Sequence, residues 1–274
     1  MNYKKDILLS EFQLYLQEKD LSKNTVSLYG YAAACFLEYQ NGESITKQAV
    51  QLYAAKLEKK YQPATVNLYL VALNQFLLWL GHEDCCIKIR SSSRKKRVEN
   101  VIDREEYEKL LKYLKRKNDE KYYAILRTLA GTGIRISELR YITVETLREG
   151  IAEVHNKGKT REIYMSESLR RDLVLYCKRR KIMSGPVFLG SGKRPITRGA
   201  INQKLLKIAE AAGVEKTKVH PHAFRHLFAK EYMKTYRNIA ELSCVLGHES
   251  VETTMIYLAN SSREYIERVS GLDL

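Results

Sequence analysis

Hydrophobic side chains recur every three to four positions through the first 81 residues, and this spacing predicts four amphipathic helices. In the first, near 4–19, the side chains of Leu8, Phe12 and Leu16 fall on one face. Residues that start or stop helices punctuate the other three: Ser22 or Asn24, Thr46, Pro63 and Gly81. The pattern is typical of a small helical bundle whose aromatic and leucine side chains form a core.

The pattern breaks at SSSRKKRVEN, residues 91–100, where serines precede four consecutive basic residues. This composition predicts an exposed, basic linker. Asp103 and Glu106 then have capping-box spacing before a helix. A second helix ends at GTG (131–133), and a short helix follows at SELRYI. Further helices are expected near 167–181, 197–212, 222–236, 238–246 and 262–270.

Residues 151–165, IAEVHNKGKTREIYM, follow a different pattern from their surroundings. Two short β-prone runs flank the polar turn NKGKT, which predicts a β-hairpin. The expected fold class is therefore mainly α with a small β-sheet.

Charge favours a polyanionic partner, with nucleic acid ahead of a membrane surface. The chain of 274 residues carries 47 Lys and Arg against 32 Asp and Glu, a formal net charge of +15. Residues 1–90 hold 10 basic and 9 acidic residues, whereas residues 91–274 hold 37 and 23. No apolar run is long enough to span a membrane, and no signal peptide is evident. The five cysteines lack metal-type spacing, so we expect a reducing cytoplasm, with association to the nucleoid.

The stretch HPHAFRHLF, residues 220–228, concentrates candidate chemistry. On a helix, His222 and His226 share a face, as two zinc ligands would, but Arg225 between them is a poor neighbour for a dication. The motifs of nucleotide hydrolysis and of two-metal nucleases are absent from the sequence. Arginines, histidines and a tyrosine near the C-terminus instead suit metal-free attack on a phosphodiester, with guanidinium groups holding the phosphate.

Four short segments in order together resemble the tyrosine recombinase (phage integrase) family: GTGIRISEL (131–139), HNKGKTREI (155–163), HAFRH (222–226) and LGHESVETTMIY (246–257). The resemblance covers the whole chain, with the size and layout of Xer-type members. It implies a helical, SAM-like core-binding DNA-binding domain over 1–90, the linker over 91–100, and a catalytic domain with a C-terminal tail helix over 101–274.

The resemblance also implies a role for each residue of the site. Arg135 and Arg225 match the two phosphate-binding arginines, and Glu138 the acidic residue that supports them. The remaining catalytic positions are Lys157 as general acid (with Lys159 as the alternative), His222 as proton acceptor or phosphate ligand, His248 as a further phosphate contact and Tyr257 as nucleophile. The basic linker residues Arg94, Lys95, Lys96 and Arg97 are expected near DNA phosphates, whereas His226 is expected to pack within the helix and His220 to lie in a loop.

A member of this family would cut and rejoin double-stranded DNA at core sites through a 3′-phosphotyrosyl intermediate and a Holliday junction. It would act as a homo-tetramer on synapsed DNA, would be a monomer or weakly associated when free, and would need no metal, ATP or other cofactor. The tail would dock on its own domain or on a neighbouring protomer. Alternatives are a type IB topoisomerase, a non-catalytic DNA-binding regulator, and a zinc protein built on His222 and His226.

Overall fold

The computed structural model describes residues 2–89, 101–156, 159–248, 250–255 and 270. The chain divides into two compact units, with the division between residues 95 and 96, and each unit is described by itself. Among the described residues, no helix is both long enough and apolar enough to cross a membrane.

The N-terminal unit is a helical bundle, as its hydrophobic spacing predicted. Ser22 and Thr46 are the N-caps of the second and third helices, accepting hydrogen bonds from the backbone N–H groups of Thr25 and Ala49. Pro63 opens the fourth helix, where a missing N–H costs nothing. The helices are α1 (Asn2–Glu18), α2 (Lys23–Gln40), α3 (Lys47–Lys60), α4 (Pro63–Trp79) and the 3₁₀ helix η1 (Glu83–Cys85).

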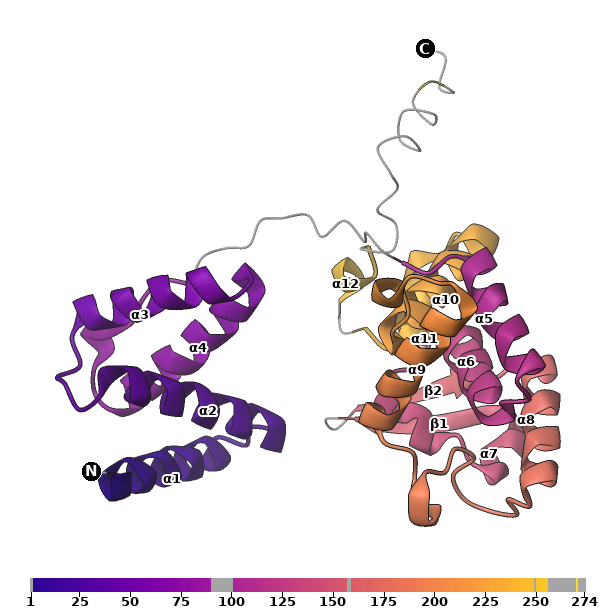
Figure 1. Cartoon of the computed structure of the whole chain (residues 1–274), viewed down its shortest axis with the longest axis horizontal. Helices are drawn as coiled ribbons and strands as arrows, with labels where there is room; N and C mark the ends of the chain where they lie inside the picture. The colour runs from indigo at the N-terminus through magenta and orange to yellow at the C-terminus, as the bar shows by residue number, and fades with distance from the viewer. Residues whose placement is uncertain (1, 90–100, 157–158, 249, 256–269, 271–274) are drawn as a thin grey trace. The chain divides into compact units, whose positions relative to one another are not determined.

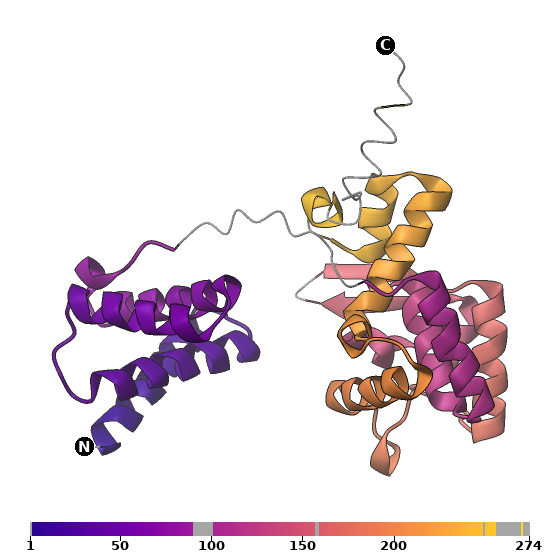
Figure 2. The ribbon, with the colours of Figure 1, turned by 45° about the horizontal axis from the view of Figure 1, so that its top comes forward.

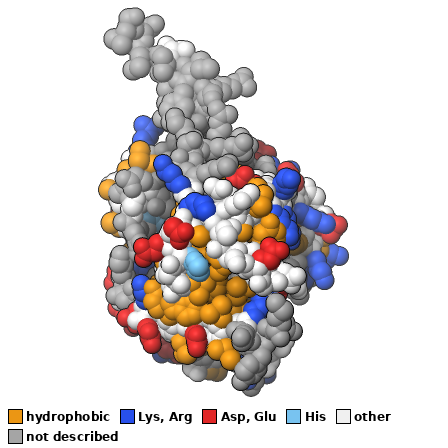
Figure 3. Space-filling view, turned by 90° about the vertical axis from the view of Figure 1, so that its left-hand side faces the viewer, with side chains coloured by type: hydrophobic (Ala, Val, Ile, Leu, Met, Phe, Trp, Pro, Cys, Tyr) orange, Lys and Arg blue, Asp and Glu red, His pale blue; other side chains and the backbone are white. Residues whose placement is uncertain are grey.

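Aromatic side chains from α1 and α4 form the centre of this bundle. The ring of Phe12 packs edge-to-face on Phe76, with centroids 5.0 Å apart, and lies 5.4 Å from the ring of Trp79. Phe12 and Phe76 are fully buried. On the outside of the unit, Figure 3 shows hydrophobic side chains gathered over part of one face, with acidic and basic side chains around them.

The C-terminal unit combines helices with a single hairpin in its described part (Figures 1 and 2). Asp103 and Glu106 form the predicted capping box at its first helix. The helices are α5 (Arg104–Arg116), α6 (Glu120–Thr132), α7 (Val144–Glu149), α8 (Glu167–Arg180), α9 (Arg198–Ala212), α10 (Pro221–Tyr236), α11 (Ile239–Leu246) and α12 (Val251–Met255), with 3₁₀ helices η2 (Ile136–Tyr141), η3 (Ser191–Lys193) and η4 (Lys216–Lys218).

The predicted hairpin is present as the antiparallel strands β1 (Ile151–Asn156) and β2 (Lys159–Tyr164). One face of this hairpin packs on the core, as the burial of three side chains shows: Ala152, Val154 and Ile163 are each at most 2% exposed. In the pairing register Val154 lies opposite Arg161, so Arg161 also occupies the inward face. The mainly α fold class with a small sheet is confirmed.

Three local features of the structure differ from the sequence prediction. The short helix predicted at SELRYI is the 3₁₀ helix η2 (Ile136–Tyr141), with Ile142 as its C-cap, because its backbone N–H groups donate three residues back, as Glu138 does to the Arg135 carbonyl oxygen. The short helices α7 and α12 were not predicted, since five or six residues show too little of the helical period. The tail helix expected near 262–270 falls, apart from residue 270, outside the described residues.

Candidate active site

The first arginine of the site follows a tight turn at the end of α6. Gly133 takes the left-handed conformation (φ 63°), and a Cβ there would lie 2.5 Å from the ring of Phe228, so this position favours glycine on two grounds. Directly after the turn, the guanidinium of Arg135 donates to Glu138 Oε1 at 3.1 Å and to the Gly247 carbonyl oxygen at 3.2 Å. The Arg135 side chain is 37% exposed and therefore remains accessible to a ligand.

The second arginine, Arg225, comes from α10, which packs against α6 and α11. Its side chain is among the largest that the structure buries, at 1% exposed. The guanidinium donates to the Gly133 carbonyl oxygen at 2.8 Å and to the Leu246 carbonyl oxygen at 2.6 Å. Arg225 thus joins the turn that carries Arg135 to the end of α11, two segments that lie more than 100 residues apart in sequence.

His248 follows the end of α11 by two residues and is held from the other side by α12. Its Nδ1 lies 2.7 Å from the hydroxyl oxygen of Thr254, which is fully buried. Burial, followed by the positive charges of Arg225 and Arg135, lowers the pKa of His248 to about 4. The imidazole is therefore neutral at pH 7, with Nδ1 paired to the Thr254 hydroxyl.

The histidines of α10 are not equivalent. His222 stays exposed, while partial desolvation, followed by the charge of Arg225, lowers its pKa. His226 is half-buried, its pKa is lowered to about 4, mainly by burial, and its ring meets that of His222 edge-to-face at 4.6 Å. His220, predicted to lie in a loop, is instead the N-cap of α10, where Nδ1 accepts from the N–H of Ala223 because Pro221 opens the helix.

Glu138 pairs with two arginines, and one of them, Arg161, was not predicted from the sequence. The Glu138 side chain is 3% exposed and accepts hydrogen bonds both from Arg135 and from Arg161 on β2. A signal was available in the sequence: Arg161 falls on the inward face of a predicted strand, together with Ile163. Because a buried guanidinium needs a carboxylate or carbonyl partner, an inward arginine predicts a buried acid nearby.

Several predicted site residues cannot be placed. Lys157 and Tyr257 lie outside the described residues, as do the linker residues Arg94, Lys95, Lys96 and Arg97. The backbone of Lys159 begins β2, but its side chain is not described. The structure therefore brings together Arg135, Glu138, Arg225 and His248 around the end of α11, with His222 on the neighbouring α10.

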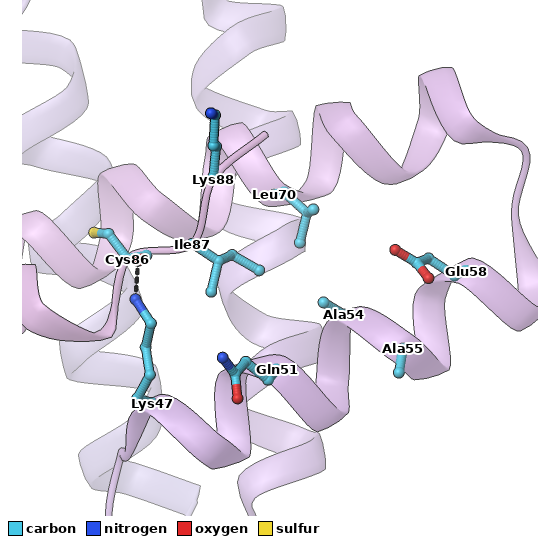
Figure 4. A pocket seen from close by; sticks show the side chains of 9 residues that line it. All are labelled: Lys47, Gln51, Ala54, Ala55, Glu58, Leu70, Cys86, Ile87 and Lys88. Atoms are coloured by element: carbon cyan, nitrogen blue, oxygen red, sulfur yellow. Dashed lines mark hydrogen bonds between the residues drawn. The ribbon is translucent and has the colours of Figure 1, made fainter. Parts of the chain in front are cut away.

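Two features of the N-terminal unit resemble binding sites. His82, Asp84 and Cys85 bring three potential metal ligands within 4.8 Å of one another, but Cys85 is buried and burial raises the pKa of its thiol, which favours the protonated form over a thiolate ligand. A pocket of about 620 Å³ lies between α3 and the segment after η1. Figure 4 shows Lys47 beside it, donating to the Cys86 carbonyl oxygen.

Comparison with known proteins decides the family. The model of the phage integrase family matches residues 100–264, and the model of the phage integrase N-terminal SAM-like domain matches residues 9–84. The chain belongs to the phage integrase family. This tyrosine recombinase is 30% identical to tyrosine recombinase XerA of Pyrococcus furiosus, over 97% of this chain and 95% of that protein. It is 27% identical to tyrosine recombinase XerC of Lactobacillus delbrueckii subsp. bulgaricus, over 91% and 93%.

Solved structures of tyrosine recombinases share the fold. The crystal structure of XerA recombinase matches with a TM-score of 0.56 and 25% identity, over 97% of this chain and 98% of that one. The post-cleavage complex of XerH with palindromic difH substrate has a TM-score of 0.73 at 17% identity, over 91% and 80%. A lambda integrase tetramer bound to a Holliday junction has a TM-score of 0.70 at 15% identity, over 91% and 76%. The recombinase is thus an enzyme of site-specific recombination with the fold of its family.

Proposed function

We propose that this recombinase cuts and rejoins DNA through a covalent bond between Tyr257 and a 3′-phosphate. The Tyr257 oxygen attacks the scissile phosphorus, and the bond from phosphorus to the 5′-oxygen breaks. The observation that carries the proposal is the convergence of Arg135, Arg225 and His248 on the end of α11. Two guanidinium groups and an imidazole in one place form a suitable receptor for the non-bridging oxygens of a phosphodiester.

Each side chain has a task in this step that suits its environment. Arg135 is accessible and binds a phosphate oxygen directly. The buried Arg225 contributes positive charge near the phosphate, and its hydrogen bonds to the Gly133 and Leu246 carbonyl oxygens hold the turn before Arg135 against the end of α11. Nδ1 of neutral His248 pairs with the Thr254 hydroxyl. In this step the imidazole carries its proton on Nε2 and donates it in a hydrogen bond to the phosphate. His222, whose lowered pKa keeps it unprotonated at pH 7, accepts the proton of the tyrosine.

The general acid of the leaving group is assigned to Lys157, which lies between β1 and β2 in the sequence. It protonates the departing 5′-oxygen, and Lys159 stands as the alternative donor. The free 5′-hydroxyl of another strand then attacks the phosphotyrosyl bond and regenerates Tyr257, so each exchange replaces one phosphodiester by another. Because bond energy is conserved, the reaction needs no ATP, and because guanidinium groups stabilise the charge on the phosphate, it needs no metal ion.

The assembly on DNA is inferred from the relatives and from charge. A lambda integrase tetramer has been solved on a Holliday junction, and XerH has been solved with its difH substrate. We infer that this chain forms a homo-tetramer on two synapsed core sites in the cytoplasm, and is a monomer or weakly associated without DNA. We further propose domain limits of 1–90, 91–100 and 101–274, in which Arg94, Lys95, Lys96 and Arg97 belong to a linker whose basic composition suits phosphate contact.

A nicked suicide substrate tests the proposal, because loss of a short 5′-fragment traps the covalent complex. The wild type should form a complex that denaturing gels retain, in the presence of EDTA and without ATP. Tyr257→Phe should form none, whereas Tyr265→Phe, the matched control eight residues later, should behave as the wild type. Relaxation of supercoiled DNA without strand transfer between two sites would instead assign a type IB topoisomerase. DNA binding without any covalent complex would contradict the proposal.

A further inference from the structure

Three consecutive carbonyl groups, those of the last two residues of α11 and of its C-cap Gly247, each accept a hydrogen bond from a different arginine. Arg161 donates to the Val245 oxygen at 2.9 Å, Arg225 to the Leu246 oxygen at 2.6 Å, and Arg135 to the Gly247 oxygen at 3.2 Å. The C-terminal carbonyls of a helix lack partners within the helix and carry its partial negative charge. Three guanidinium groups therefore fix the segment that leads directly into His248.

Arg161 differs from the other two because it has no assigned role in the chemistry. Its side chain is 15% exposed, and its guanidinium forms an ion pair with Glu138 as well as the bond to the Val245 oxygen. Burial lowers the pKa of Arg161, and Glu138 opposes that shift. At Gly247, a Cβ would lie 2.2 Å from Arg161 Cδ, which shows how closely the arginine crosses the backbone next to His248.

The two contacts of Arg161 lead to two different phosphate-binding groups. Through the Glu138 carboxylate, it fixes the anion that holds the Arg135 guanidinium. Through the Val245 oxygen, it fixes the end of α11 three residues before His248. Through Arg161, strand β2 thereby fixes the positions of both Arg135 and His248, although its described side chains include no proposed phosphate ligand.

We propose that Arg161 is a positioning residue of the recombinase, which holds Arg135 and His248 in register to receive the scissile phosphate. The inference rests on the proposed function, because it concerns the geometry of that phosphate receptor. Arg161 itself does not bind DNA: its guanidinium is turned inward to Glu138 and to the backbone of α11. Its loss should weaken stabilisation of charge on the phosphate and leave protonation of the leaving group unchanged.

Arg170 is a matched control for a merely structural role. Its guanidinium also donates to two consecutive helix-end carbonyls, those of Leu147 and Arg148 at the end of α7. It makes these contacts away from Glu138 and His248, so it reports the effect of losing a helix-end arginine without touching the phosphate receptor. Arg161→Gln and Arg170→Gln should therefore both lower the melting temperature, but only the first should slow cleavage.

Three suicide substrates separate the ways in which Arg161 could act. One has a normal scissile phosphate. The second has a methylphosphonate, which lacks the negative oxygen that the arginines stabilise. The third has a bridging 5′-sulfur, whose thiolate leaves without a proton donor. Rates of covalent complex formation are compared within one variant, so the fraction of folded enzyme cancels in each ratio of rates.

With the normal phosphate, Arg161→Gln should cleave about 100-fold more slowly than the wild type, the scale expected when a reacting group is misplaced by about 1 Å. Arg161→Lys should be intermediate, because one ammonium group cannot reach both partners. The defect of Arg161→Gln should shrink to within about threefold on the methylphosphonate, since a neutral phosphoryl group needs less cationic stabilisation, and it should persist on the sulfur substrate.

Three results would overturn the inference while leaving the proposed function intact. They are an equal defect on phosphate and methylphosphonate, rescue by the bridging sulfur, and a loss of melting temperature with unchanged cleavage. Absence of a covalent complex with the wild-type enzyme would instead contradict the proposed function, so the two failures are distinguishable.

Discussion

Replacement of Gly247 by alanine should damage both stability and cleavage, through the side chain of Arg161. Gly247 is the C-cap of α11 with φ 62°, and its added Cβ would lie 2.2 Å from Arg161 Cδ and 2.8 Å from Nε. No rotation of the guanidinium alone relieves contacts with mid-chain atoms. The Arg161 side chain must move, and its hydrogen bonds to Glu138 and to the Val245 oxygen are lost.

The expected loss of stability has two contributions. A left-handed alanine costs about 1–2 kcal/mol relative to glycine. Loss of a charge-assisted hydrogen bond costs about 1.5–3 kcal/mol, and the 15% exposure of Arg161 limits compensation by water. Gly247→Ala should therefore lower the free energy of unfolding of the C-terminal unit by about 2.5–5 kcal/mol, the sum of these two ranges.

Gly213→Ala supplies the matched control. Gly213 is the C-cap of α9 with φ 68°, nearly the same backbone conformation, but nothing lies within 4 Å of its added Cβ. It should show only the backbone cost of about 1–2 kcal/mol. The difference between the two variants isolates the displacement of Arg161.

The assay is urea unfolding followed by far-UV circular dichroism and by tryptophan fluorescence. The single tryptophan, Trp79, belongs to the N-terminal unit, so its fluorescence transition should be the same in both variants. The remaining dichroism transition reports the C-terminal unit. Equal losses of stability for Gly247→Ala and Gly213→Ala, with equal cleavage of a suicide substrate, would refute the reasoning.

The remaining predictions concern other contacts of the same unit. Thr254→Val removes the hydroxyl beside His248 Nδ1, so the tautomer of His248 is no longer fixed by that contact. Cleavage should slow at least tenfold, about the loss typical of removing a group that orients a ligating histidine. Thr254→Ser should retain most of the rate, and equal rates for the two variants would contradict this. The free energy of unfolding should fall as the pH drops from about 6.5 to about 4. In this range the histidines of the unfolded chain take up protons, whereas folded His226 and His248, both with a pKa of about 4, do not. Replacing both by glutamine should make the urea midpoint depend less on pH. Asp103→Ala removes a capping box and should cost about 1 kcal/mol in urea unfolding without changing cleavage.

Much of the fold was predictable because helix periods and caps are local properties of the chain. The caps at Thr46 and Asp103 were predicted from residue type and spacing, and Ser22 was one of two residues predicted for the cap of α2. Helix α7 was missed although Thr143 caps it and Gly150 ends it, since six residues present less than two helical turns. The capping residues Thr143 and Gly150 alone, without a repeat of hydrophobic residues between them, would have predicted α7.

The site was predictable as a set of residues but not as an arrangement. Motif order predicted Arg135, Arg225 and His248 as site residues. Their shared contact with the backbone at the end of α11 could not be predicted, because backbone carbonyls are the same for every residue type. Arg161 left a weak mark, an arginine on the inward face of a strand. Its carboxylate partner, Glu138, lies 23 positions away, and only the folded chain shows the pair.

The central claim is that Tyr257 carries the DNA, and peptide mapping of the trapped complex tests it most directly. The wild-type protein is incubated with the nicked substrate, the DNA is digested to a nucleotide remnant, and the modified peptide is located by mass spectrometry. The account predicts a single phosphotyrosyl adduct at Tyr257, the ninth residue after His248. An adduct at Tyr265 or at any other residue would contradict it.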